Sequence, residues 1–205
     1  MRLGLVLVAC LLAGCNRPPQ RRPDQSRPST RSTPVKRAYN DAFWTHWGDG
    51  MAEMNGYKLT FRRYGQLRSG TAVAIFVNET FAKSLRVKSD PGRRSPADEM
   101  PVMKMNLLKE YQTGIYNYSE MTSVFTALGP TRPYSAGWPA KISFSSQEWC
   151  GHVYGQVLFQ LPRLSVSWHS YFDGEADSLR QMEVPGTRVA KTRYISGLAK
   201  SASRS

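Results

Sequence analysis

The chain has 205 residues, 28 of them basic and 15 acidic, and a formal net charge of +13. A basic balance of this size is common in nucleic-acid-binding proteins, but here the charge lies mainly at the two ends. Residues 16–37 carry a net charge of +6 and residues 186–205 a net charge of +5, whereas residues 38–185 hold 15 basic and 14 acidic side chains. The nearly neutral body argues against a nucleic-acid partner, and its length predicts one domain.

Residues 1–14 have the pattern of an export signal. Arg2 precedes an apolar run at residues 3–12, which is too short for the roughly twenty residues of a membrane-spanning helix. The run ends in LAGC at residues 12–15, which resembles the lipobox of bacterial lipoproteins. That resemblance implies cleavage before Cys15, a thioether-linked diacylglycerol on its sulfur and an N-acyl lipid on its amino group. The alternative is an ordinary signal peptide with a cysteine nearby by chance.

The segment from the lipidated cysteine to residue 37 is expected to be a disordered tether. Residues 16–37 contain five prolines and seven basic residues but almost nothing apolar, so they cannot bury enough surface to fold. Asn16 stands where an Asp would favour retention in the inner membrane. The resemblance to lipoproteins therefore implies a lipid anchor in the cell envelope, in the outer membrane facing the periplasm, with surface display left open.

Residues 184–205 are expected to be a basic, disordered tail that an anionic membrane would attract. The chain could also be a shortened version of a longer sheet, because its strand pattern stops near residue 183. After processing, Cys150 is expected to be the remaining thiol, so no internal disulfide can form.

The body, residues 38–183, has the alternation of short strands between turn residues. One helical turn is expected within residues 38–57, and loops at residues 89–101 and 129–139. Strands are expected at residues 57–62, 71–77, 85–88, 102–110, 115–125, 141–145, 152–161 and 164–172. This pattern predicts a mainly β domain with little helix: a single antiparallel, strongly curved sheet, either a half-barrel or a barrel-like meander that closes on itself or around a helix.

The densest group of reactive side chains is Glu148, Trp149, Cys150 and His152. On a continuous strand, Glu148, Cys150 and His152 would share one face and could form a nucleophile set. The alternative is a structural bulge at Gly151, with Trp149 in the core and Cys150 as a small buried hydrophobe. A Cys-x-His pair supplies two ligands where zinc needs three or four, so we expect no metal.

Aromatic residues gather at two further places. Trp44, His46 and Trp47 could form a sugar-stacking platform, a membrane contact or a plug at the end of a barrel. Tyr116 and Tyr118, together with Met121 and Phe125, could line a concave apolar sheet face that holds an acyl ligand, or could be ordinary core.

Two resemblances bear on function. The lipobox together with QEWCGH at residues 147–152 resembles a family of bacterial envelope lipoproteins of unknown activity. The curved sheet more loosely resembles the outer-membrane lipoprotein carrier and receptor proteins, whose half-barrel sheet shields acyl chains. Neither resemblance assigns a functional residue, and the second is an analogy of architecture.

These patterns predict a membrane-anchored, non-enzymatic lipoprotein that binds a lipid or another apolar ligand, or an envelope protein partner. We expect no cofactor apart from the lipid on Cys15. Motifs of serine hydrolases, zinc peptidases and P-loop proteins are absent from the sequence. Two alternatives stay open: an enzyme centred on Cys150 and His152, and a cell-wall glycan-binding module that uses Trp44 and Trp47.

The lipid anchor predicts that Cys15→Ser moves the protein from the membrane fraction to the soluble fraction. Each buried methylene contributes about 0.8 kcal/mol, so two or three acyl chains hold the protein on the membrane and their loss releases it. Cys10→Ser, which changes a residue removed with the signal, should leave the membrane fraction unchanged. Immunoblots of fractionated cells measure both, and a Cys15→Ser variant that stays on the membrane would contradict the anchor.

Overall fold

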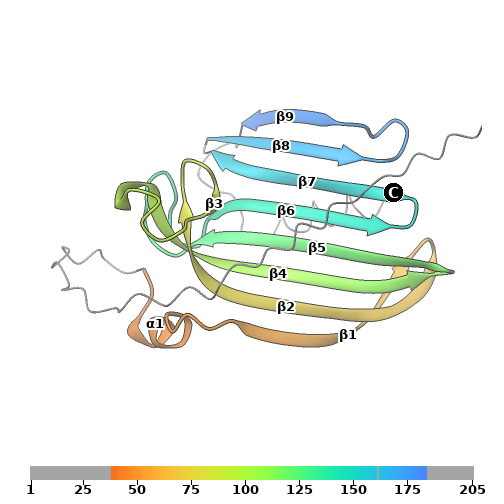
Figure 1. The fold of residues 1–205 in the computed structure, drawn as a ribbon, viewed down its shortest axis with the longest axis horizontal. Helices are drawn as coiled ribbons and strands as arrows, with labels where there is room; N and C mark the ends of the chain where they lie inside the picture. Colours follow the sequence, from red (N-terminus) through yellow and green to blue (C-terminus); the bar gives the residue numbers. More distant parts are fainter. Residues whose placement is uncertain (1–37, 161, 184–205) are drawn as a thin grey trace, which may run out of the picture. The chain divides into compact units, whose positions relative to one another are not determined.

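A computed structural model describes residues 38–160 and 162–183 of the chain. Within them, nine strands form one antiparallel sheet (Figure 1). The mainly β, curved-sheet fold predicted from the sequence is therefore confirmed. Cys15, the predicted signal and tether, and the predicted basic tail lie outside the described residues.

The strands follow one another in the sheet almost in chain order. The path is β1-β2-β4-β5-β6-β7-β8-β9, and the short β3 pairs with the end of β2. The elements are α1 (Asp41–Trp47), β1 (Glu53–Arg63), β2 (Gln66–Ala82), β3 (Val87–Lys88), the 3-10 helix η1 (Pro96–Asp98), β4 (Glu99–Thr113), β5 (Tyr116–Ala127), β6 (Pro139–Glu148), β7 (Gly151–Gln160), β8 (Arg163–Ser170) and β9 (Ser178–Glu183).

The sheet is open and not closed into a barrel. In the described part of the chain β1 pairs with β2 and β9 pairs with β8, and these two strands form the edges. Of the two forms that the sequence left open, the half-barrel therefore holds and the closed meander does not. The expected helical turn is α1, which begins after Asn40, whose side chain accepts a hydrogen bond from the Phe43 N–H at 3.0 Å.

The register gives the sheet two chemically different faces, because successive side chains of a strand point to opposite sides. We call one the apolar face. Its residues on the central strands are Ala72, Ala74 and Phe76 of β2, Met103, Met105 and Leu107 of β4, Val124 of β5, Ile142 and Phe144 of β6, Val153 and Val157 of β7, and Val166 and Trp168 of β8.

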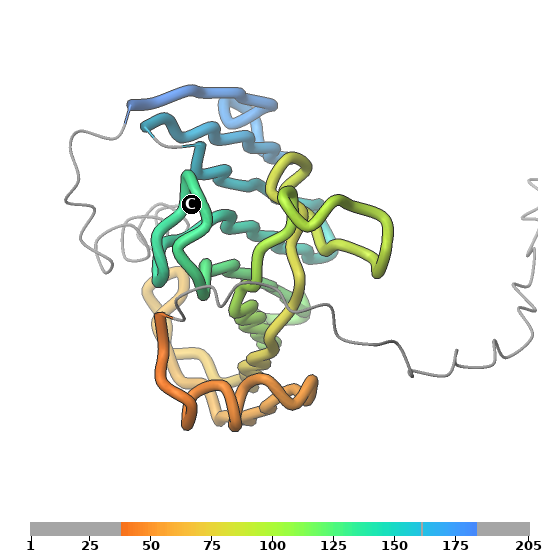
Figure 2. Tube along the Cα trace, turned by 90° about the vertical axis from the view of Figure 1, so that its left-hand side faces the viewer, coloured from red at the N-terminus to blue at the C-terminus, as the bar shows by residue number. Residues whose placement is uncertain are grey.

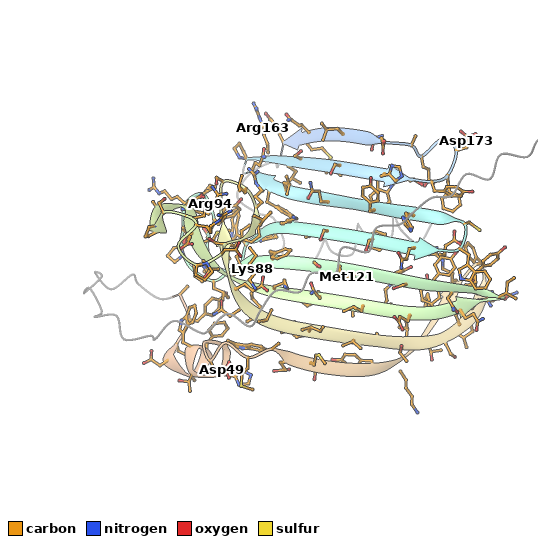
Figure 3. All side chains as sticks on the ribbon, viewed as in Figure 1. Asp49, Lys88, Arg94, Met121, Arg163 and Asp173 are labelled. Carbon is orange, nitrogen blue, oxygen red and sulfur yellow. The ribbon has the colours of Figure 1, made fainter. Side chains whose placement is uncertain are left out.

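We call the opposite side the polar face. Over β5 to β8 its side chains are mainly uncharged and polar, among them Ser119, Ser123, Ser143, Ser145, Gln147, Gln156, Ser165 and Ser167. Toward β2 and β4 it becomes apolar, with Val73, Ile75 and Leu108. Met121, labelled in Figure 3, lies on this face beside Leu108.

The buried core lies at one end of the sheet, where two loops cover opposite faces (Figure 2). Residues 83–98 cover the polar face, and the Lys141 Nζ donates to the Arg86 carbonyl there at 3.3 Å. Residues 128–138 cover the apolar face, and the Tyr134 hydroxyl donates to the Phe159 carbonyl at 2.8 Å. Phe81 is fully buried in this core, so the stability of the domain is concentrated at this end.

Replacement of Phe81 by Ala should therefore destabilise the domain strongly. The large-to-small change leaves a cavity among packed neighbours and should cost about 3–5 kcal/mol of unfolding free energy. Leu179 of β9 is 72% exposed, and Leu179→Ala should change stability by no more than about 0.5 kcal/mol. Urea unfolding followed by tryptophan fluorescence measures both. Equal losses in the two variants would place the core elsewhere.

Candidate functional site

The residues predicted to be functional fall into two groups at opposite ends of the sheet. Trp44, His46 and Trp47 belong to α1, beside the start of β1 (Figure 1). The turns of the β4–β5 and β6–β7 hairpins lie at the other end, which we call the hairpin end. There the structure brings together Tyr116, Tyr118, Glu148, Trp149, Cys150 and His152.

A cleft at the hairpin end follows from the lengths of the strands. Pairing between β4 and β5 continues to Thr113 and Tyr116, whereas pairing between β5 and β6 begins only at Ser119 and Gln147. The two hairpins therefore separate and leave a cleft of about 660 Å³, within the range of about 300–1,000 Å³ typical of ligand sites. Its lining residues are Glu110, Tyr111, Gln112, Asn117, Tyr118, Ser119, Gln147, Glu148, Trp149 and His152.

Polar side chains make up most of this lining. One cross-strand row on the polar face runs through Glu110, Ser119, Gln147 and His152 of four successive strands. A second row places Gln112 opposite Asn117. Sequence analysis did not identify Glu110, Gln112 or Asn117, because their strands lie far from residues 147–152 in the chain and only the sheet joins them.

Trp149 and Cys150 form the turn between β6 and β7 and do not lie in a buried bulge. Trp149 is 65% exposed and Cys150 is an exposed free thiol, so the expected burial of both residues was wrong. The turn separates Glu148 from His152, which lie on opposite faces of the sheet. The chain reverses at Trp149 and Cys150 and has no bulge at Gly151, which is the first residue of β7 and pairs with Glu148. This turn breaks the single face that a nucleophile set would need.

The Glu148 carboxylate contacts Cys150. It accepts a hydrogen bond from the Cys150 backbone N–H at 2.9 Å. Its hydrogen bond with the thiol is the main cause of a raised Cys150 pKa, and a contact with Tyr116 opposes it only in part. A catalytic cysteine needs a lowered pKa, so this geometry argues against a nucleophilic role.

A buried polar cluster supports the cleft from the apolar side of the sheet. The Tyr111 hydroxyl donates to Glu120 at 2.6 Å, and Lys109 forms an ion pair with the same carboxylate. Tyr118 stacks on Tyr111 with ring centroids 5.0 Å apart. Burial is the main cause that raises the pKa of Tyr118 to about 12, with a hydrogen bond to Tyr64 second. The side chain of Tyr118 is therefore packed in place and forms part of the cleft wall.

The expected grouping of Tyr116 and Tyr118 with Met121 and Phe125 on one face was wrong. Tyr116 and Tyr118 lie on the apolar side of β5, whereas Met121 and Phe125 lie on the polar face. The reason is the two-residue period of a strand, since even and odd positions point to opposite sides.

One aromatic residue of α1, Trp47, contacts the sheet. Trp47 lies against Phe76 of the apolar face with ring centroids 6.3 Å apart, and the His46 Nε2 lies 3.3 Å from the Glu53 carboxylate. Hydrogen bonds, first from Asn55 and then from His46, lower the pKa of Glu53. Trp44 and Trp47 are both half-buried, so neither presents a fully open ring.

The middle of the apolar face is a second candidate site. Two adjacent cross-strand rows from β2 to β8 contain no charged side chain, and each ends on a β8 residue, Trp168 or Val166. The rings of Phe144 and Trp168 are parallel, with centroids 6.0 Å apart. Trp168 lies flat over Gly155, where a Cβ atom would come within 2.4 Å of the indole. The glycine therefore allows the indole to form part of a continuous apolar surface.

Comparisons of the chain with protein-family models, curated proteins and solved structures found no match in any of the three. Residues 38–160 and 162–183 contain no group of three or more His, Cys, Asp or Glu side chains placed to hold a metal ion. Neither helix in this part of the chain is long and apolar enough to cross a membrane.

The contact of Glu148 with Cys150 predicts that Glu148→Gln accelerates alkylation of the thiol. Removal of the carboxylate lowers the thiol pKa, so the thiolate fraction at pH 8 increases. Iodoacetamide labelling followed by mass spectrometry measures the rate, with Glu175→Gln as a surface control. If the Glu148→Gln rate stays unchanged or falls, then Glu148 does not set the thiol pKa.

Proposed function

We propose that this protein is a lipid-anchored envelope protein whose sheet binds an acyl chain on its apolar face. The observation that supports the proposal is the pair of uncharged apolar rows that cross the sheet from β2 to β8. Phe76, Met105, Leu107, Phe144 and Trp168 in these rows are only half-buried. A contiguous apolar surface of this extent is rare on a protein without a partner for it.

The dimensions and chemistry of the face favour a long, flexible, apolar ligand. Six strands at about 4.8 Å spacing give the rows a length of roughly 24 Å. The side chains of the rows carry two hydrogen-bonding groups, the Thr122 hydroxyl and the Trp168 indole N–H, so they offer little specificity beyond burial of apolar surface. Each methylene that leaves water there would contribute about 0.8 kcal/mol.

Packed side chains limit the apolar face at both of its ends along the strand direction. At the core end, residues 128–138 lie over it, with Tyr134 bound to the Phe159 carbonyl. At the hairpin end, Tyr111 and the ion pair of Lys109 with Glu120 close it. An acyl chain would therefore lie across the strands, between two closed ends. The predicted lipid anchor on Cys15 supports the proposal, since it would keep the domain close to such chains.

Two neighbouring leucines of β4 provide the test. Leu107 lies on the apolar face and Leu108 on the polar face, and both are half-buried. In the unlipidated chain from Asn16 onward, Leu107→Glu should weaken binding of the fluorescent fatty acid cis-parinaric acid by about tenfold or more. The reason is that a carboxylate would be desolvated against the ligand. Leu108→Glu should bind like the parent.

Thermal unfolding of both variants separates lost binding from lost stability, since the two changes are matched in residue type and strand. Equal affinities for the probe in the two variants, or no binding to the parent, would overturn the proposal. A third outcome is that the parent captures an envelope protein, the Leu107→Glu variant does not, and neither binds fatty acid. That outcome would assign the apolar face to a protein partner.

A further inference from the structure

We propose that the cleft at the hairpin end is a second binding site, which takes a neutral sugar or an amino sugar. It uses residues other than Trp44 and Trp47 and lies at the opposite end of the sheet from α1. The inference does not depend on the acyl-chain proposal, because the polar rows of the cleft belong to the opposite face from the apolar rows.

An exposed aromatic pair stands at the cleft. Trp149 lines it from the β6–β7 turn, and Tyr116 at the start of β5 meets the indole edge to face, with ring centroids 5.7 Å apart. Trp149 is 65% and Tyr116 39% exposed, so the pair offers a ligand a large apolar area beside the polar lining. A ring held by a hairpin turn and an aromatic neighbour can stack against the C–H face of a pyranose.

The polar lining provides the hydrogen-bonding groups that a sugar needs. Gln112, Asn117 and Gln147 each present an amide donor and an amide acceptor a short distance apart. Glu110 and Glu148 add carboxylate acceptors. Paired donors and acceptors beside an aromatic ring match the vicinal hydroxyls and apolar faces of a sugar ring, and they match acyl chains poorly.

The charge of the cleft selects against anionic ligands. Glu110 and Glu148 line it, and among the described residues that form it there is no Lys or Arg. Residues 38–185 hold 15 basic and 14 acidic side chains, so this cleft is an acidic region of a nearly neutral domain. Phosphates and uronic acids would be repelled, whereas a neutral sugar or an ammonium group on a sugar would not.

The test uses the full-length protein purified from membranes in a detergent without a sugar headgroup. Neutral trisaccharides of glucose, mannose and N-acetylglucosamine, the trisaccharide of glucosamine, and trigalacturonate are added in turn. Saturation-transfer NMR and tryptophan fluorescence report binding. We expect at least one neutral or amino trisaccharide to bind and trigalacturonate not to bind.

Matched variants locate the site. Trp149→Ala should weaken binding of that trisaccharide by about tenfold or more, because the stacking surface is lost. Tyr57→Ala, which removes an exposed aromatic ring of β1, should stay within about twofold of the parent. Gln112→Leu, which keeps the side-chain size but removes the amide, should also weaken binding. Far-ultraviolet circular dichroism and thermal unfolding should match the parent in all three variants, which shows that they are folded.

The proposal fails if no neutral or amino trisaccharide binds at millimolar concentration, or if trigalacturonate binds best. It also fails if Trp149→Ala and Gln112→Leu bind sugar like the parent. Loss of fatty-acid binding in Leu107→Glu with sugar binding retained would show two independent sites. Failure of the acyl-chain proposal alone would leave the sugar result unaffected.

Discussion

The continuous antiparallel register from β2 to β8 is the constraint on which both candidate sites depend. Because the strands pair side by side and alternate with a period of two, each residue of one strand has a partner of the same orientation on the next. Leu107 and Leu108 are adjacent in the chain, yet the register assigns one to the apolar face and the other to the polar face. A shift of one residue in any strand would exchange the faces of that strand and interrupt the uncharged rows.

Side chains are packed more closely at the two ends of the sheet than in its middle, and this difference determines where the two candidate sites lie. The core around Phe81 and Tyr134 closes one end. At the other end, the buried carboxylate of Glu120 holds Tyr111 and Lys109. A charged group in such surroundings is tolerated because both partners contact it. The middle of the apolar face lies between these ends with half-buried rings, and the cleft lies beyond the second end, where the two hairpins separate.

Fold and site were predictable from the sequence to different extents. Alternation in residues 57–62 and 102–110 predicted strands correctly, because apolar side chains recur at every second position in much of each segment. The same criterion missed β9, because its side chains are mostly exposed and apolar residues do not occur at every second position. The segment around Cys150 was singled out from the sequence as a candidate site, but the expected burial of Trp149 was wrong. A Trp in a two-residue turn has the same neighbours in sequence as a Trp in a bulge, and only the pairing of β6 with β7 distinguishes them.

The sequence by itself determined the kind of element and the chemistry available: β-strands, a nearly neutral body between basic ends, and no known catalytic motif. These properties are local, since they depend on residue type and on spacing within a few positions. The tertiary structure alone decided which residues meet. Gln112, Asn117 and Gln147 line one cleft although up to 35 positions separate them, because strand lengths and hairpin ends, set by long-range pairing, determine where the sheet opens.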